Sequence, residues 1–234
     1  MTSKSIDENH KIDAATRFNL YPKIDIQEYE QLHNSRIIPT ILKIDVADFF
    51  ETMKKYDSYF KNWSNNRPDQ IGIRQGLPLV NLTGRYTDDN DITIGPLDYY
   101  NKNNPDNRYN ETDIRVFTKI LYEKCFDPLQ ILHDYIIRSS ILKWKKGANF
   151  FPHKDLQPPT PHLRLWGTTD PDNIKLRFEN DQGELIEVEN VEAGRIYIID
   201  TAITHDAHCV NDIGYQFFIA VASEAYDIME RIKQ

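Results

Sequence analysis

A chain of 234 residues is long enough for one sizeable domain that buries its own hydrophobic core. Its 40% hydrophobic content, with 11 Phe and 13 Tyr, excludes a disordered polymer. The net charge of −8 excludes a general nucleic-acid binder, because phosphate contacts need a basic surface. We therefore expect a folded protein with no nucleic-acid partner.

The lack of a recognisable targeting signal and the small number of cysteines favour a cytoplasmic location. Cys125 and Cys209 are too few for a disulfide framework and form no CxxC metal pair. The N-terminal sequence MTSKSIDENHKIDAATRFN has no apolar run like that of a signal peptide, and no stretch approaches the roughly 18 apolar residues of a membrane helix. The expectation is a cytoplasmic protein without a membrane partner.

The first elements expected along the chain are a tail, a strand and a helix. Residues 1–20 are polar and indicate a flexible tail, so that residues 21–234 would form a single domain. Arg36–Ile44 is strand-like and is followed by a helix, for which Asp45 is the expected N-cap. The apolar face of that helix repeats every three or four residues, at Phe49, Met53, Tyr56 and Phe60. Gln70–Gly84 then alternates apolar residues, as one or two strands would.

Residues 85–112 differ in character from the rest, being rich in Asn, Asp, Tyr and Pro. So long a polar connection inside a compact domain is uncommon and is often a functional lid, although a solvated insertion without a role is an equal alternative. Ile114–Cys125 follows with helical periodicity, and we expect it to pack as a helix on the outside of a sheet.

Everything after Pro128 indicates β-structure. Short runs rich in Val, Ile, Phe and Tyr are bounded by Gly, Pro, Asn or Asp. They are DYIIRSSILKWKKG, ANFFPH, HLRLWGTT, IKLRFEN, GELIEVENV, GRIYIIDT and YQFFIAVAS. Strands at this spacing predict a mainly β fold with flanking helices, arranged as a sandwich or barrel.

His153 and Asp155 give the first sign of chemistry. Residues i and i+2 of a strand project to the same face, so both side chains can point into the barrel while Lys154 points away. A second histidine from another strand would complete two imidazoles and one carboxylate. That is the ligand set of non-haem Fe(II) oxygenases, and it leaves positions open for substrate and O₂. By itself the His-x-Asp pattern is weak, since it occurs by chance in many proteins.

Two histidines downstream compete for the third ligand position. Gly194–Asn211 runs through an apolar strand to Asp200 and then reaches His205 and His208 in a short loop. His205 is nearer to the preceding strand and is the preferred ligand. His208 is an alternative ligand, a hydrogen-bond donor to the ligands, or a surface residue. The bland alternative is that all these histidines are hydrogen-bonded residues at strand edges.

Three segments together resemble the aspartyl/asparaginyl β-hydroxylase-like branch of the 2-oxoglutarate- and Fe(II)-dependent oxygenases. They are LKWKKGANFFPHKD, HLRLWGTT and AGRIYIIDTAITHDAHCVN, and the resemblance covers about residues 128–223. It implies a double-stranded β-helix, that is, a cupin-like jelly roll, in which His153, Asp155 and His205 hold the iron. The family's animal hydroxylases lack the carboxylate ligand that Asp155 would supply.

Arg164 alternates with apolar neighbours and would face inward, where an unpaired charge is expensive. The resemblance implies that Arg164 binds a carboxylate of 2-oxoglutarate or of the substrate; a structural salt bridge is the equal alternative. The superfamily usually has a basic residue about ten positions beyond the distal histidine, but this chain has Gln216 there, which carries no charge. Arg138 or Arg164 is the expected replacement, unless the co-substrate is not 2-oxoglutarate.

The sequence thus leads to the hypothesis of an Fe(II)- and 2-oxoglutarate-dependent oxygenase that uses O₂ to hydroxylate an amino-acid or protein side chain. The alternatives are a cupin-like metal dioxygenase that needs no 2-oxoglutarate and a non-enzymatic jelly-roll binding module. The loops around such a site set the substrate, and the sequence does not predict it.

Overall fold

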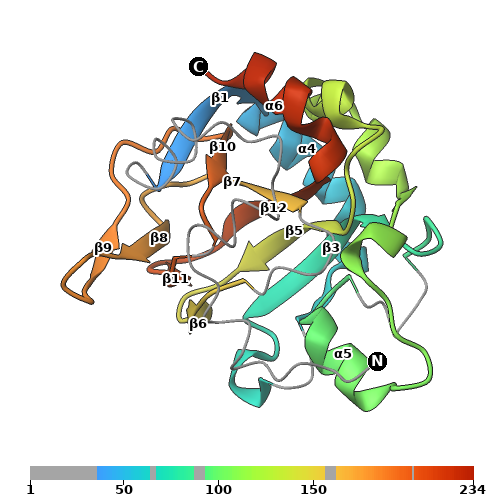
Figure 1. Cartoon of the computed structure of the whole chain (residues 1–234), viewed down its shortest axis with the longest axis horizontal. Coiled ribbons are helices and arrows are strands. Elements are labelled where there is room, and N and C mark those ends of the chain that lie inside the picture. Colours follow the sequence, from blue (N-terminus) through green and yellow to red (C-terminus); the bar gives the residue numbers. More distant parts are fainter. Residues whose placement is uncertain (1–35, 64–66, 87–92, 156–161, 202) are drawn as a thin grey trace.

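The computed structural model describes residues 36–63, 67–86, 93–155, 162–201 and 203–234, which form two antiparallel β-sheets with helices on one side (Figure 1). The tail expected over residues 1–20 lies outside these described residues.

The larger sheet contains four strands of the barrel and the additional strands that extend it on both sides. Its order is β1 (Ile37–Lys43), β10 (Arg195–Ile199), β7 (His162–Thr168), β12 (Gly214–Ala222), β5 (Ser139–Trp144), β3 (Arg74–Asn81) and β2 (Lys61–Asn62), with β4 (Val116–Phe117) paired to β3. The smaller sheet has the order β6 (Asn149–His153), β11 (His205–Cys209), β8 (Ile174–Glu179) and β9 (Leu185–Glu187).

From β5 onward the chain crosses repeatedly between the two sheets. β5, β7, β10 and β12 belong to the larger sheet, whereas β6, β8, β9 and β11 belong to the smaller one. This winding is a double-stranded β-helix, or jelly roll, as the sequence predicts. The core strands span 139–222, within the predicted 128–223.

Alternation of side chains builds the core between the sheets. In β8, buried residues alternate with half-buried ones, so that Ile174, Leu176 and Phe178 face the larger sheet. They meet inward-facing residues of the larger sheet, namely Leu142, Trp144, Trp166, Tyr197 and Ile199. This apolar layer is a rigid support for side chains placed at its open end.

The outer face of the larger sheet is covered by helices. Asp45 caps α4 (Val46–Tyr56) as predicted, its Oδ1 accepting a hydrogen bond from the Asp48 N–H at 2.8 Å. Phe49 on α4 packs edge-on against Phe217 of β12 at 5.1 Å between ring centroids. α6 (Tyr226–Ile232) lies close to α4 in Figure 1 and buries Met229 in the same cluster.

Ile114–Cys125, expected as a helix, is not one. It contains β4 and the short 3₁₀ turn η4 (Lys119–Tyr122), and the longer η5 (Lys124–Leu132) begins at its end. The Thr118 N–H and hydroxyl both bond to backbone carbonyls of β3, which draws this stretch into pairing with the sheet. Tertiary pairing outweighs local helix periodicity here.

The described part of the segment predicted as a lid, within residues 85–112, contains α5 (Leu97–Asn103) and the start of η3 (Glu111–Asp113). The remaining short 3₁₀ turns are η1 (Asp57–Tyr59), η2 (Pro68–Gln70) and η6 (Ser223–Ala225). Among the described residues, no helix is both long and apolar enough to span a bilayer.

Candidate metal centre

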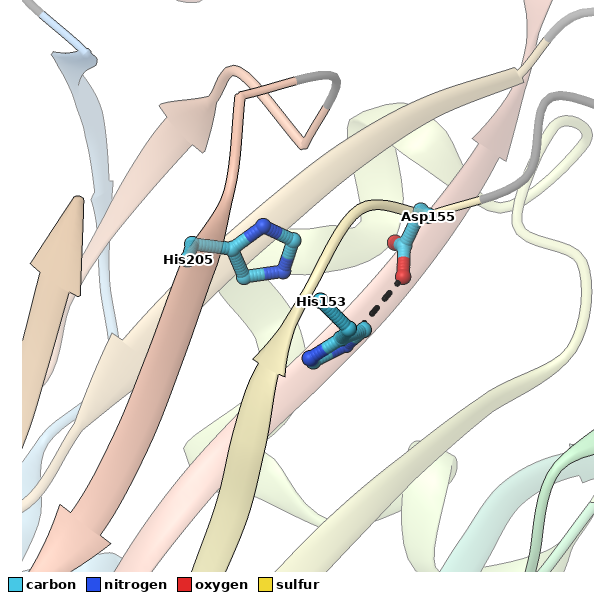
Figure 2. A group of neighbouring side chains, drawn as sticks. All are labelled: His153, Asp155 and His205. Carbon is cyan, nitrogen blue, oxygen red and sulfur yellow. Dashed lines mark ion pairs between the residues drawn. The ribbon is translucent and has the colours of Figure 1, made fainter. Parts of the chain in front are cut away.

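His153, Asp155 and His205 come together at one end of the barrel, with one potential ligand atom from each lying within 4.8 Å of the others. Figure 2 shows His205 projecting from β11 toward His153 and Asp155, at the end of β6 and just beyond it. The register explains this meeting, because His205 lies directly opposite His153 in the antiparallel β6–β11 pair. Their ring centroids are 4.5 Å apart.

A bulge in β6 re-aims these side chains. His205 pairs with His153, but Ala207 pairs with Phe150. Over this stretch β6 therefore contains one more residue than β11. Pro152, which cannot donate to the ladder, lies within the bulge. On a regular strand, residues three positions apart point to opposite faces. The bulge instead brings the rings of Phe150 and His153 close together, with centroids 5.9 Å apart.

Each imidazole is held in the tautomer that suits metal binding. The Nδ1 of His153 lies 2.7 Å from the Phe151 carbonyl oxygen, and the Nδ1 of His205 lies 2.9 Å from the Ile203 carbonyl oxygen. A carbonyl oxygen only accepts hydrogen bonds, so each Nδ1 carries a proton, and in the neutral imidazole Nε2 is then the nitrogen that can bind a metal. Such outer contacts orient metal-ligating histidines.

Asp155 lies beyond the end of β6 rather than on the strand, and its N–H donates to the Thr201 carbonyl at 2.9 Å. Its carboxylate lies 3.5 Å from His153 Nε2 and accepts a hydrogen bond from Arg164 Nε at 3.1 Å. Burial raises the pKa of Asp155, but the contact with His153 and the charge of Arg164 outweigh it and hold that pKa well below its usual range. Asp155 is therefore ionised, as a ligand to a hard cation must be.

The two histidines differ in environment. Burial lowers the pKa of His205, which is the more buried of the pair. Burial also acts to lower the pKa of His153, but the Asp155 carboxylate and the Phe151 carbonyl outweigh it, so the pKa is raised. The His153 side chain is 40% exposed, so this side of the site faces solvent.

Behind the three candidate ligands lies a buried network of arginines and carboxylates. Arg164 on β7 binds Glu111 of η3 bidentately, through Nη1 at 2.5 Å and Nη2 at 2.9 Å. Arg138 Nη1 reaches the same carboxylate at 3.1 Å, and its Nη2 donates to the carbonyls of Thr93 and Gly95. Both guanidiniums are thus paired with carboxylates of the chain itself. Whether they also meet a co-substrate stays a prediction.

Gln216 and His208 occupy different settings. Gln216 is buried on β12 beside Leu142, and its Oε1 has no hydrogen-bond partner in the described part of the chain. His208 pairs with Lys175 across β8 and alternates with Ala207, so it lies on the opposite face of β11 from His205. His205, and not His208, lies with the other two candidate ligands. His205 also begins a strand, where a loop was expected.

Glu111 and Arg74 are the polar residues near this site that the sequence does not single out. Glu111 is separated from Arg164 by 53 positions, and no local pattern links them. Arg74 lies in the apolar run that forms β3. The presence of an arginine in that run is the feature of the sequence from which its role could have been suspected.

The chain matches no protein-family model and no curated protein. Similar solved structures include a prolyl-4-hydroxylase from Pseudomonas putida, with 11% identity over 82% of this chain and 95% of that one, and a TM-score of 0.46. A prolyl hydroxylase complex with a hypoxia inducible factor peptide fragment, from Trichoplax adhaerens, matches 98% of this chain and 97% of that one, with 8% identity and a TM-score of 0.45. An oxalate oxidase matches 39% of this chain, with 12% identity and a TM-score of 0.30, and the match spans only 44% of that enzyme's chain. Similarities this distant assign no activity to the chain.

Proposed function

We propose that this protein is an Fe(II)- and 2-oxoglutarate-dependent oxygenase that hydroxylates an amino-acid or protein side chain. The observation that carries the proposal is the meeting of two imidazoles and one carboxylate within 4.8 Å at the open end of a jelly roll. Nitrogen and carboxylate donors in this number suit Fe(II) and leave coordination positions free.

His153, Asp155 and His205 would hold the iron, the histidines through Nε2. The carbonyls of Phe151 and Ile203 fix both rings, and Arg164 orients Asp155 through its 3.1 Å hydrogen bond. Iron and 2-oxoglutarate, when bound, supply the O₂-activating chemistry that places an oxygen atom in a C–H bond and yields succinate and CO₂. The chain's own part is to bind, orient and exclude water.

Charge balance supports a dianionic co-substrate. In the network behind the site, the positive charges of Arg138 and Arg164 cancel the negative charges of Glu111 and Asp155. A divalent cation would add two positive charges to this buried region, where uncompensated charge is costly. A dianionic chelator such as 2-oxoglutarate offsets this added positive charge, whereas a neutral ligand does not.

The surface beside the metal ligands supports a substrate group presented from outside. His153 and Asp155 are partly exposed. Phe151, which precedes His153 by two positions on β6, is 60% exposed. The Arg67 guanidinium lies 3.6 Å from the Phe151 ring centroid, which holds this aromatic surface in place. A side chain of a protein or peptide fits this exposed approach better than a ligand that must be fully enclosed.

The test is succinate formation from 2-oxoglutarate under air, with Fe(II) and the purified protein. We expect turnover by the wild type and its loss in His153→Ala, Asp155→Ala and His205→Ala. His208→Ala is the matched control, since that ring lies on the other face of β11, and it should retain turnover. Turnover that survives all three ligand substitutions would refute the site.

One observation favours a second candidate, a cupin-like metal dioxygenase that needs no 2-oxoglutarate. Gln216 carries no charge, and both predicted arginines are already paired with Glu111 or Asp155. Tight Fe(II) binding without any effect of 2-oxoglutarate would support this candidate. If the protein binds no Fe(II) and the ligand variants behave like the wild type, both enzyme proposals fail.

A further inference from the structure

Arg74 is a third inward-facing arginine. It lies opposite Trp144 in the β3–β5 pair, and its side chain is 2% exposed. Its guanidinium carbon lies 4.4 Å from the ring centroid of Phe150, on the smaller sheet, so the side chain spans the space between the sheets. The Phe150 ring is in turn the neighbour of His153. A single aromatic ring therefore separates Arg74 from a metal ligand.

The charge of Arg74 has no counter-ion in the part of the chain that the structure describes. Its contacts are a hydrogen bond from Nη1 to the Asn149 carbonyl and stacking on Phe150 and Trp63. Asp69, the nearby acid that acts on it, is bound bidentately by Arg67 at 2.9 and 2.7 Å. Burial, with the charge of Arg67, lowers the pKa of Arg74 to about 9. This contrasts with Arg164, whose pKa the carboxylates raise against the effect of burial.

Unused hydrogen-bond donors gather around the same aromatic ring. The buried N–H groups of Arg74 Nε, Trp63 Nε1 and Trp144 Nε1 have no acceptor among the described residues. Both indole rings contact Phe150, at 5.5 and 5.2 Å between centroids. Buried donors are almost always satisfied, and donors clustered around an unpaired cation fit an anionic acceptor.

We propose that Arg74 binds the carboxylate of 2-oxoglutarate that lies away from the metal, with Trp63 and Trp144 beside it. This inference rests on the proposed function and names the cation that Gln216 fails to supply. It places that cation on β3, a strand outside the sequence resemblance, and leaves Arg138 and Arg164 to the Glu111 network.

The experiment compares two 2-oxo acids that differ in the far carboxylate. Binding of 2-oxoglutarate and of 2-oxobutanoate is measured anaerobically by calorimetry on the Mn(II)-loaded wild type and on Arg74→Gln. We expect Arg74→Gln to weaken 2-oxoglutarate binding by at least about 30-fold, because it removes one partner of a buried charge pair. The affinity for 2-oxobutanoate, which has no far carboxylate, should change less than about threefold. Tryptophan fluorescence should respond to 2-oxoglutarate in the wild type only.

Arg195→Gln is the matched control, because Arg195 is a partly buried arginine already paired with Glu192, and it should leave both affinities unchanged. Equal weakening of both acids in Arg74→Gln, or no weakening of either, would overturn the role of Arg74. A wild type that binds Mn(II) but neither acid would instead refute the proposed function. Mn(II) affinity, measured for each variant, confirms that the site is intact.

Discussion

Both imidazoles of the candidate site use the same local device, a carbonyl two residues earlier in the chain that binds Nδ1. Both carbonyls belong to the backbone just before the histidine, so no additional side chain is needed to orient the ring. Asp155 has no such local support and depends on Arg164, which comes from another strand. Asp155 is therefore the candidate ligand whose position is most sensitive to substitutions outside the site.

Arg164→Lys should weaken metal binding by about 10–100-fold, because a lysine cannot bridge Glu111 and Asp155 at once. The measurement is the dissociation constant for Mn(II). Arg177→Lys is the control: Arg177 also forms a bidentate ion pair, with Asp206, but not with a metal ligand. Equal affinity in both variants would show that Arg164 does not position Asp155.

The grouping of the three candidate ligands could be predicted from the sequence, because two of them are close together and the third follows a recognisable order of strands. His153 and Asp155 are two positions apart, and His205 follows the strand that ends near Asp200. Glu111 is different, since its contact with Arg164 depends on how a 3₁₀ turn settles against the barrel. No periodicity in the sequence encodes such a contact.

Among the elements, the segment over residues 93–113 is attached to the barrel by apolar packing, through Ile94, Leu97 and Tyr109, and by a set of charged contacts. Arg138 bonds to carbonyls near its start, at Thr93 and Gly95, and to Glu111 near its end. One arginine thus holds both ends of the segment. Ordering of this segment and integrity of the arginine network are coupled.

Glu111→Gln should lower the free energy of unfolding by roughly 3–5 kcal/mol, because it removes the counter-charge shared by two buried guanidiniums. Urea denaturation measures this loss, and limited proteolysis should show faster cleavage within α5. Glu192→Gln is the control, since Glu192 pairs with Lys43 and Arg195 at a 43% exposed position and should cost much less stability than Glu111→Gln. Similar losses in both variants would contradict a buried network.

Gly194→Ala should be more destabilising than Gly147→Ala, although both glycines have positive φ, of 78° and 86°. A Cβ at Gly147 meets nothing within 4 Å, so only backbone strain of about 1–2 kcal/mol applies. A Cβ at Gly194 would collide with the Ile44 carbonyl, at the junction of β1 and β10, adding about 1–3 kcal/mol. Chemical denaturation of the two variants checks the order, and equal losses would contradict it.

The strands and α4 could be predicted because period-two and helical patterns are local. β11 was missed since its five residues, HDAHC, are largely polar and look like a loop. Its strand form comes from pairing with β6 and β8 on both sides. The helix predicted over Ile114–Cys125 was wrong for the same reason, because pairing with β3 determines the conformation of this stretch.

Over the whole molecule, the jelly roll was predictable from the number and spacing of strands, whereas the contributions of β3 and of the 93–113 segment to the site were not. Both enter through contacts between parts of the chain that are far apart in sequence.

Metal binding should stabilise the whole fold. A ligand at 100 times its dissociation constant adds about 2.7 kcal/mol, which for a protein of this length corresponds to a Tm increase of roughly 5–10 °C. Scanning calorimetry with Mn(II) measures the shift, and His205→Ala should show none. A shift that persists in His205→Ala would place the metal elsewhere.

The position of β6 has a consequence for how fast a metal would leave. β6 ends the smaller sheet and, among the described strands, pairs only with β11. It carries His153, with Asp155 just after it, while His205 lies on β11. Separating these two strands at one point would divide the ligands without unfolding the barrel. Release of the metal to a chelator would then follow the rate of this local opening, so that hydrogen exchange at Phe150 and Phe151 and the metal's dissociation rate should rise and fall together across variants.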